Sequence, residues 1–395
     1  MHSLKTIRDL DVSGKRVLAR VDFNVPQENG QIIDDTRIRG ALPTIRYLVE
    51  GGAKLVLASH LGRPQGKPVE SLRMDPIAER LSELLVRPVL KLDDCVGEMV
   101  ERAVSGMKPG EVVLLENTRF HEGETKNDPV FAEALARVGE LFVNDAFGTA
   151  HRAHASNYGV AKHLPAVAGL LMAKEVEQLS RAVEDPEMPF VTIIGGKKAG
   201  SKIGVLHDLM DRVETFLIGG GVAFTFLAAQ GYGIGDSVVD EQMLDEAARL
   251  IETADHHGVS LLLPVDLRIA ERFDAGAVTR IVPVDGIPQG WIGLDIGPET
   301  VAAFNAQVAR ARTIVWAGPL GAFELEPFIE GTQQVAEAVA TSAAFSIIGG
   351  GETAAAIVKL GLADRMDHVS TGGGASLAFL QGKTLPAIEL LQADR

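Results

Sequence analysis

The sequence predicts an α/β protein with two doubly wound parallel-sheet (Rossmann-like) domains joined by a hinge helix. Three observations lead to this prediction. Apolar, β-branched runs alternate with helical patterns along the chain, the runs are continuously apolar, and several lead directly into glycine-rich turns. Such strands are typical of a parallel sheet that helices cover on both faces. With 395 residues, the chain is long enough for two such cores.

Strands and helices follow one another regularly in both halves. In the first half, we expect strands at 16–21, 54–58, 111–115 and 140–144, with helices at 38–50, 76–86 and 130–138. In the second half, we expect strands at 190–194, 213–218, 259–264, 313–316, 344–348 and 367–370. Three later strands lead into triple glycines at 219–221, 349–351 and 372–374. These turns would lie at the carboxyl edge of the sheet, where doubly wound folds bind ligands.

An amphipathic helix is predicted between the two halves. Met172, Val176, Leu179 and Val183 recur at spacings of four, three and four, so they share one helical face over 170–184. The prolines that follow end this helix before the next strand. We therefore expect a first domain over 1–170, an interdomain helix and linker over 171–189, and a second domain over 190–384.

Composition and charge exclude several classes of protein. The net charge of −15 argues against broad binding to nucleic acids or membrane surfaces, which needs a basic field. Cys95 is the only cysteine, which excludes an intramolecular disulfide framework. The start of the chain lacks the apolar core of a signal peptide, and no apolar run approaches the length of a membrane span. We therefore expect a cytoplasmic protein.

The segment 191–205, VTIIGGKKAGSKIGV, combines a strand, a tight turn and a helical pattern. Gly195 and Gly196 allow the backbone to turn and to approach a ligand closely. Lys198 and Lys202 are four residues apart, so on a helix they would share a face and form a polyphosphate site at its start. The segment is not a Walker A loop, because the last two residues of that motif are swapped. A solvated, lysine-rich helix start is the alternative.

Arginines and histidines gather just after the expected strands of the first half. With nearby polar residues, they are Arg20, Asp22, Asn24, Arg37, His60, Arg63, Arg119, His151, Arg152 and His154. Because arginine pairs bidentately with carboxylates and phosphates, this edge should hold a small molecule with several negative charges. A zinc site at His60, His151 and His154 is the alternative. These histidines lack a paired-ligand spacing, however, and their arginine neighbours repel a cation.

A set of motifs makes the chain similar to the phosphoglycerate kinase family. In chain order they are RVDFNVP, SHLGRP, LLENTRF, DAFGTAHRAHAS, GGGVAFTFL, LPVD, VWAGPLGAFE, GGGETAA and HVSTGGGASL, which span residues 20–377. The resemblance implies reversible transfer of a phosphoryl group from 1,3-bisphosphoglycerate to ADP, giving 3-phosphoglycerate and ATP, with Mg²⁺, by a monomer. It also implies that the first domain binds phosphoglycerate, that 385–395 packs back onto this domain, and that the second domain binds the nucleotide.

The resemblance implies site residues in both domains. Phosphoglycerate would be bound by Asp22, Asn24, Arg37, His60, Arg63, Arg119 and Arg152. The nucleotide would be bound by Lys198, Lys202, Gly220, Gly293, Glu324, Gly350, Gly351, Glu352 and Thr353, with Glu324 at the ribose and Glu352 also holding magnesium. Catalytic roles would fall to Arg37, Lys198, Gly373 and Gly374. Because the acceptor carboxylate is already ionised at neutral pH, the transfer needs no general base.

Three positions of the second half depart from the family pattern. Lys197 stands where the family usually has a small residue, so it either adds a cation to the site or points to solvent. Ala317 replaces an asparagine, with loss of a hydrogen bond near the nucleotide phosphates. Glu352 replaces an aspartate, and its extra methylene moves the carboxylate by about a bond length, which a bridging water can accommodate.

Two other functions compete with the kinase. Ala317 and Glu352 would suit a relative that binds phosphoglycerate or nucleotide but transfers poorly. A nicotinamide-dependent dehydrogenase would share the fold. It needs a G-x-G-x-x-G turn with an acid about 20 residues later, which the triple glycines do not supply.

Overall fold

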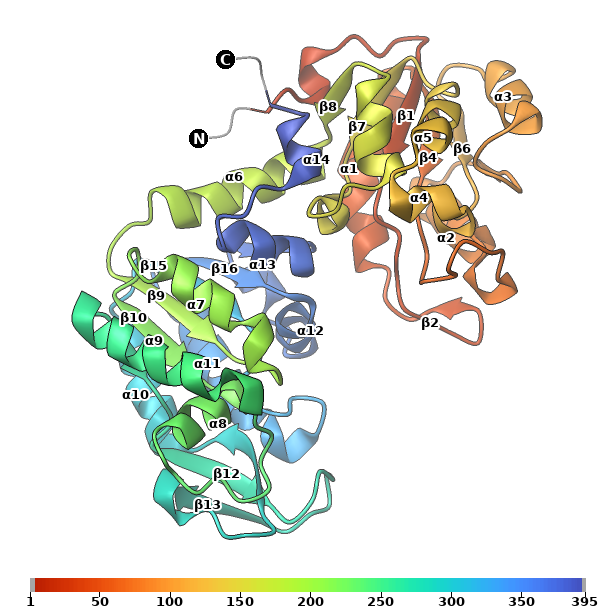
Figure 1. The fold of residues 1–395 in the computed structure, drawn as a ribbon. Helices are drawn as coiled ribbons and strands as arrows, with labels where there is room; N and C mark the ends of the chain where they lie inside the picture. Colours follow the sequence, from red (N-terminus) through yellow and green to blue (C-terminus); the bar gives the residue numbers. More distant parts are fainter. Residues whose placement is uncertain (1–3, 393–395) are drawn as a thin grey trace. The chain divides into compact units, whose positions relative to one another are not determined.

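The computed structural model describes residues 4–392, which divide into two compact units (Figure 1). The first unit contains residues 4–177 and 384–392, and the second contains residues 178–383. Each unit is built on a parallel sheet with helices between its strands, so the predicted fold class is confirmed. Within residues 4–392, no helix is both long enough and apolar enough to cross a membrane.

The first unit is organised on a six-stranded parallel sheet in the order β5-β6-β4-β1-β7-β8. Its strands are β1 (Arg16–Arg20), β4 (Lys54–Ala58), β5 (Val89–Lys91), β6 (Val112–Leu114), β7 (Leu141–Asn144) and β8 (Ala166–Ala168). The sequence does not predict β5 and β8, because edge strands this short carry little apolar pattern. The chain leaves β1 toward β4 and later returns to β7 on the other side. The carboxyl ends of β1 and β7 therefore flank a topological switch point.

Helices cover both faces of this sheet. They are α1 (Thr36–Glu50), α2 (Asp75–Leu85), α3 (Glu98–Ser105), α4 (Glu122–Lys126) and α5 (Pro129–Ala136). Two short strands, β2 (Gln27–Glu28) and β3 (Gln31–Ile32), form a separate antiparallel pair. Successive strand residues point to opposite faces. Val17 and Ala19 therefore pack with α1 and α2 in one core, whereas Leu18 packs with α3 and α5 in the other.

The second unit repeats this plan. Its parallel sheet has the order β11-β10-β9-β15-β16-β17, with β9 (Phe190–Ile194), β10 (Thr215–Ile218), β11 (Ser260–Leu262), β15 (Thr313–Ala317), β16 (Phe345–Gly349) and β17 (His368–Val369). The helices are α7 (Ile203–Leu209), α8 (Gly220–Ala229), α9 (Leu244–His257), α10 (Pro298–Val308), α11 (Glu330–Thr341), α12 (Gly351–Lys359) and α13 (Gly374–Leu380). The switch point lies between β9 and β15. As predicted, the triple glycines lead into helices, here α8, α12 and α13.

A small antiparallel sheet interrupts the pattern between β11 and α10. Its central strand β12 (Asp266–Ala270) pairs with β13 (Thr279–Pro283) and with β14 (Ile292–Ile296). Phe224 and Leu227 of α8 pack against Leu267 and Ile269 of β12, which gives this sheet its own core. The sequence analysis does not anticipate these strands, because β13 is largely exposed and lacks a continuous apolar run.

Helix α6 (Leu170–Glu184) forms as predicted and crosses the boundary between the units, after residue 177. Asp145, just after β7, accepts hydrogen bonds from the backbone nitrogens of Leu171 and Met172 at 2.9 and 3.1 Å. This carboxylate therefore anchors the start of α6 in the first unit. Burial raises the pKa of Asp145 to about 7.

The chain returns to the first unit after α13. Helix α14 (Pro386–Glu389) belongs to this unit, and Leu391 O accepts a hydrogen bond from Lys5 N at 3.0 Å. Residues 393–395 of the expected returning segment lie outside the described residues. The domain limits expected from the sequence stay predictions.

Candidate functional site

The first candidate site lies at the carboxyl edge of the first sheet. Parallel strands end at a common edge, so residues that follow different strands meet there. We call the group the arginine cluster: Asp22 and Asn24 after β1, Arg37 in α1, His60 after β4, Arg119 after β6, and Arg152 after β7.

Arg37 joins the segment after β1 to the start of α1. Its Nη1 lies 3.2 Å from Asp22 Oδ2 and donates to Asn24 O at 3.0 Å. Asn24 Oδ1 in turn accepts from Gly62 N at 2.9 Å. Within residues 4–392, the Nε and Nη2 atoms of Arg37 have no hydrogen-bond partner, so they remain able to donate to a ligand.

His60 is buried and neutral in this cluster. Burial holds its pKa well below the usual value, and the charges of Arg20, Arg119 and Arg37 lower it further. His60 Nδ1 lies 2.9 Å from Arg20 Nη2, and because arginine only donates, Nδ1 accepts. The 3.9 Å separation of His60 Nδ1 and Asp22 Oδ1 is therefore not an ion pair.

Arg119 and Arg152 make this edge strongly positive. Burial lowers the pKa of Arg119 to about 10, and repulsion from Arg20 and Arg152 contributes. Arg119 Nη1 donates to Gly62 O at 2.7 Å, whereas its buried Nε has no partner among the residues that the structure describes. Like charges held together in a buried setting are stabilised by an anion. The cluster is therefore chemically suited to a small anionic ligand.

Arg63 is the exception among the predicted substrate residues. Its side chain is exposed, and none of the interactions found within residues 4–392 connects it to the cluster. The structure brings the other predicted substrate residues together without it.

Two buried polar residues that the sequence analysis misses are connected to His60 of the arginine cluster through Arg20. Ser156 Oγ accepts from Arg20 Nε at 2.8 Å and donates to Glu124 Oε1 at 2.6 Å. Ser156 ends the motif DAFGTAHRAHAS, but nothing in that motif indicates its partners, and Glu124 lies in none of the quoted motifs. Their connection exists only through the fold.

The histidines do not form a metal site in the described residues. Burial holds the pKa of His154 at about 4 and also lowers that of His151. Within residues 4–392, three potential metal ligands come together at Asp94, Cys95 and His121. Burial raises the pKa of the Cys95 thiol well above its usual value, which makes it a poor ligand.

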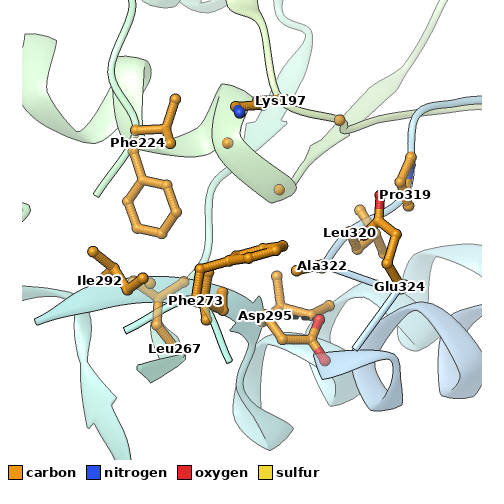
Figure 2. A pocket seen from close by; sticks show the side chains of 18 of the residues that line it. Lys197, Phe224, Leu267, Phe273, Ile292, Asp295, Pro319, Leu320, Ala322 and Glu324 are labelled. Atoms are coloured by element: carbon orange, nitrogen blue, oxygen red, sulfur yellow. Dashed lines mark hydrogen bonds between the residues drawn. The ribbon is translucent and has the colours of Figure 1, made fainter. Parts of the chain in front are cut away.

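The second candidate site is a cavity of about 440 Å³ at the carboxyl edge of the second sheet (Figure 2). Its lining includes Gly196 just after β9 and Pro319 just after β15, so we call it the switch-point cavity. Figure 2 shows the side chains of Phe224, Phe273 and other apolar residues around one end, with Glu324 at the opposite end. This arrangement suits a ligand with an apolar ring and a polar remainder.

Predicted nucleotide residues line part of this cavity, namely Gly220, Gly293, Glu324 and Glu352. A Cβ atom at Gly293 would lie 2.1 Å from Phe224 Cζ. A Cβ atom at Gly220 would lie 2.8 Å from Pro319 O, and the φ of Gly220 is +59°. Glycine at both positions therefore keeps the cavity open. The sequence analysis misses the apolar wall, because its residues come from separate segments.

Lys197 is the one basic side chain among the described residues that line the cavity. The acidic side chains there are Asp236, Asp295, Glu324 and Glu352. Burial raises the pKa of Asp295 to about 8, although both of its oxygens accept hydrogen bonds from backbone N–H groups. Lys197 lines the cavity and is also exposed to solvent, so the role of its charge stays a prediction.

The expectation that Lys198 and Lys202 share a helical face is wrong. Lys198 has an extended backbone (φ −112°, ψ 118°), a short 3-10 helix covers Ala199–Ser201, and α7 begins at Ile203. Gly200 disfavours the regular α-helix that a spacing of four requires. Lys198 is exposed, whereas Lys202 is buried, and burial lowers the pKa of its ammonium group.

Gly350, Gly351 and Thr353 form the start of α12 and do not line the cavity. Thr353 Oγ1 accepts from Gly318 N at 2.6 Å and donates to Gly349 O at 2.8 Å. Its hydroxyl proton is therefore used within the protein, where it ties α12 to the ends of β15 and β16. Lys202 lies close by, since its Nζ would be 4.0 Å from a Cβ atom at Gly350.

Gly373 and Gly374 lie at the start of α13. The first backbone hydrogen bonds of this helix run from Ala375 N to Gly372 O at 3.0 Å and from Leu377 N to Gly373 O at 3.3 Å. The N–H groups of the two glycines precede these bonds, as is usual for a helix start. Gly373 has a φ of +54°, which favours glycine.

Ala317 is the last residue of β15 and is fully buried. Its carbonyl accepts a hydrogen bond from Gly195 N at 3.1 Å, and it does not line the cavity. The side-chain amide that an asparagine would supply is therefore absent at the end of β15, beside Gly195.

The comparisons with known proteins agree along nearly the whole chain. The family model described as phosphoglycerate kinase matches residues 7–383. A phosphoglycerate kinase from Moorella thermoacetica is 55% identical over 386 residues, with 98% of each chain covered. The solved structure of phosphoglycerate kinase from Coxiella burnetii is similar with a TM-score of 0.88, 43% identity and 98% of each chain covered. The solved structure of phosphoglycerate kinase from Pyrococcus horikoshii is similar with a TM-score of 0.86 and 35% identity. This match covers 99% of the present chain and 98% of the Pyrococcus horikoshii chain.

Proposed function

Because this chain belongs to the phosphoglycerate kinase family, and so transfers a phosphoryl group between ATP or ADP and the carboxyl group of phosphoglycerate, we propose that its two units divide the reaction. The observation that carries this proposal is the contrast between the sites. One is a cluster of arginines around a neutral histidine, and the other is a cavity with an apolar and a polar end. The first suits a small anion, and the second suits a nucleotide. No observation favours a relative that binds without transfer.

The first unit binds 3-phosphoglycerate and 1,3-bisphosphoglycerate. Their carboxylate and phosphate groups match the donors of the arginine cluster, with Arg63 joining from the surface. The assigned ligands are Asp22, Asn24, Arg37, His60, Arg63, Arg119 and Arg152. The assignment of Arg37 is supported by its Nε and Nη2 donors, which have no partner within residues 4–392. The assignment of Arg119 is supported by its buried Nε, which also has no partner within these residues.

The second unit binds ATP and ADP. The base lies in the apolar end of the cavity near Phe224 and Gly293, and Glu324 contacts the ribose. The phosphates lie near the helix starts, where backbone N–H groups and lysines favour anions. The remaining assigned residues there are Lys198, Lys202, Gly220, Gly350, Gly351, Glu352 and Thr353.

Glu352 would hold magnesium together with the nucleotide phosphates. Its carboxylate lines the cavity and accepts no hydrogen bond from residues 4–392, so its oxygens remain open to a cation. One carboxylate, phosphate oxygens and waters are the ligand set that Mg²⁺ usually takes. When bound, the ion neutralises charge on the phosphates.

The chain's own residues act by positioning and charge. Arg37 and Lys198 face the moving phosphoryl group, and the N–H groups of Gly373 and Gly374 donate to its oxygens in the transition state. The acceptor is an ionised carboxylate, so no residue has to remove a proton.

The two units have to approach each other during the reaction. Direct transfer needs reacting atoms about 3–3.5 Å apart, with water excluded. We place the hinge near residues 185–189 and in the glycine turn before Ala375. The radius of gyration from small-angle scattering should fall when both ligands are bound and not with either alone.

The protein is further proposed to be a cytoplasmic monomer that does not bind nucleic acid. Light scattering after size-exclusion chromatography would test whether it is a monomer.

Calorimetric titration and a coupled assay together test the assignment. The protein should turn over 3-phosphoglycerate with ATP and magnesium, and it should bind each substrate separately. Arg152→Ala should lose phosphoglycerate affinity and keep ADP affinity, and Gly293→Ala should do the reverse. The opposite pattern would show that the substrates are assigned to the wrong units. Binding of both without turnover would favour the non-catalytic relative.

A further inference from the structure

A buried chain of hydrogen bonds leads from Glu124 to His60. Ser156 Oγ donates to Glu124 Oε1 at 2.6 Å and accepts from Arg20 Nε at 2.8 Å. Arg20 Nη2 then lies 2.9 Å from His60 Nδ1. None of these four residues is more than 3% exposed, so water does not compete for the bonds.

Donor and acceptor chemistry gives this chain one direction. A guanidinium group only donates and a carboxylate only accepts, so the Ser156 hydroxyl directs its single proton toward Glu124. The same rule makes His60 Nδ1 an acceptor, which in a neutral imidazole leaves the proton on Nε2. Within residues 4–392, His60 Nε2 has no hydrogen-bond partner. Its N–H group is therefore free for a ligand.

We infer that Glu124, Ser156 and Arg20 are positioning residues that hold His60 as a neutral Nε2–H donor. Asp22 Oδ1 is the competing partner, because it lies 3.9 Å from His60 Nδ1 and would favour a proton there. Arg20 prevents this by donating to Nδ1. The other groups facing His60 are Arg119, Arg37 and His154, none of which offers a negative charge.

This role separates Arg20 from the arginines of the cluster. Arg20 directs its Nε, Nη1 and Nη2 atoms at Ser156, the carbonyl of Val21 and His60. Burial lowers the pKa of Arg20, and the charges of Glu124 and Asp22 oppose this shift. Arg20 therefore orients a ligand-binding residue and does not itself bind the ligand.

The tautomer can be read directly by two-bond ¹H–¹⁵N correlation NMR on the full chain, free of ligand, with ¹⁵N-labelled histidine. His60 should show a protonated Nε2 and an acceptor Nδ1 at neutral pH, with its signals assigned through His60→Gln. In Arg20→Gln, the proton should shift to Nδ1 beside Asp22. Ser156→Ala, a milder change that should preserve folding, should produce a mixture of tautomers. Ser346→Ala alters a buried serine of the second unit and should leave His60 unchanged.

A protonated Nδ1 in the unaltered protein, or unchanged His60 signals in both variants, would overturn the inference.

The consequence of this tautomer for ligand binding rests on the proposed function of the arginine cluster. Ser156→Ala should weaken 3-phosphoglycerate binding about three- to tenfold and leave ADP affinity unchanged. A shifted tautomer with unchanged phosphoglycerate affinity would overturn the role in binding. If Arg152→Ala also left this affinity unchanged, the assigned site would be wrong while the tautomer result stood.

Discussion

The two candidate sites differ in charge and in apolar surface. The arginine cluster brings several cations together, and burial, with mutual repulsion, lowers the pKa of Arg119 to about 10. The switch-point cavity has Lys197 as the one basic side chain of its described lining, and it relies on glycine turns and apolar walls. The difference follows from the ligands proposed for them. A small polyanion offers little besides charge, whereas a nucleotide offers a large ring that an apolar wall can bind.

The largest expected effect is a loss of kcat in a variant of Lys198, and a comparison with Lys197 separates catalysis from ADP binding in the second unit. Lys198→Ala should lower kcat about a hundredfold with little change in ADP affinity, because an interaction made mainly in the transition state lowers kcat. Lys197→Ala should instead weaken ADP binding several-fold and retain kcat, since Lys197 lines the cavity and Lys198 does not. Steady-state kinetics and titration of both variants measure the split. Equal losses of kcat would show that the two lysines share one role.

The next effect tests which arginines belong to the first site. Arg152→Ala should weaken 3-phosphoglycerate binding about ten- to a hundredfold, because a hydrogen bond to a charged group contributes about 1.5–3 kcal/mol. Arg63→Ala should have a smaller effect, because Arg63 is exposed and apart from the cluster. Isothermal titration calorimetry compares them. A larger loss at Arg63 would mean that the ligand lies nearer the surface than the cluster indicates.

A third effect tests the apolar half of the nucleotide cavity. Gly293→Ala should weaken ADP binding about tenfold, because its Cβ atom would displace the ring of Phe224, and overpacking costs about 1–3 kcal/mol. Phosphoglycerate affinity should not change. Gly233→Ala is the matched control, since no atom lies within 4 Å of its added Cβ and its φ is not positive. Unchanged ADP affinity in Gly293→Ala would place the base elsewhere.

The smallest effect is on stability, and it has opposite signs in the two units. The pKa of His154 falls from 6.5 to about 4 on folding, so the unfolded chain binds more protons between these values and stability falls as pH drops from 6.5 to 4. The pKa of Asp295 rises from 3.8 to about 8, so the folded protein binds more protons there and stability falls as pH rises from 4 to 8.

Scanning calorimetry between pH 4.5 and 8 should reveal both effects, because a pKa that changes on folding makes stability depend on pH. Relative to the unaltered protein, His154→Gln should gain unfolding temperature toward acid pH, and Asp295→Asn should gain it toward pH 8. Parallel profiles for all three proteins would show that neither group has a shifted pKa.

The sequence by itself determined the alternating α/β plan, the main strands and the glycine turns after them. Continuously apolar strands can be buried only in a sheet covered on both faces, and parallel strands place their following residues at one edge. The sequence alone therefore groups Asp22, His60 and Arg119. The motifs along the chain also indicated the family.

Only the tertiary structure decided the surroundings of each side chain. It showed that a 3-10 turn separates Lys198 from Lys202, that Arg63 lies apart, and that Arg20 is committed to Ser156 and His60. Hydrogen-bond partners, burial and pKa depend on groups far apart in sequence: Glu124 meets Ser156, and Gly293 meets Phe224. Local sequence patterns show which face of a helix or strand is apolar, but they do not identify the residues that pack against that face.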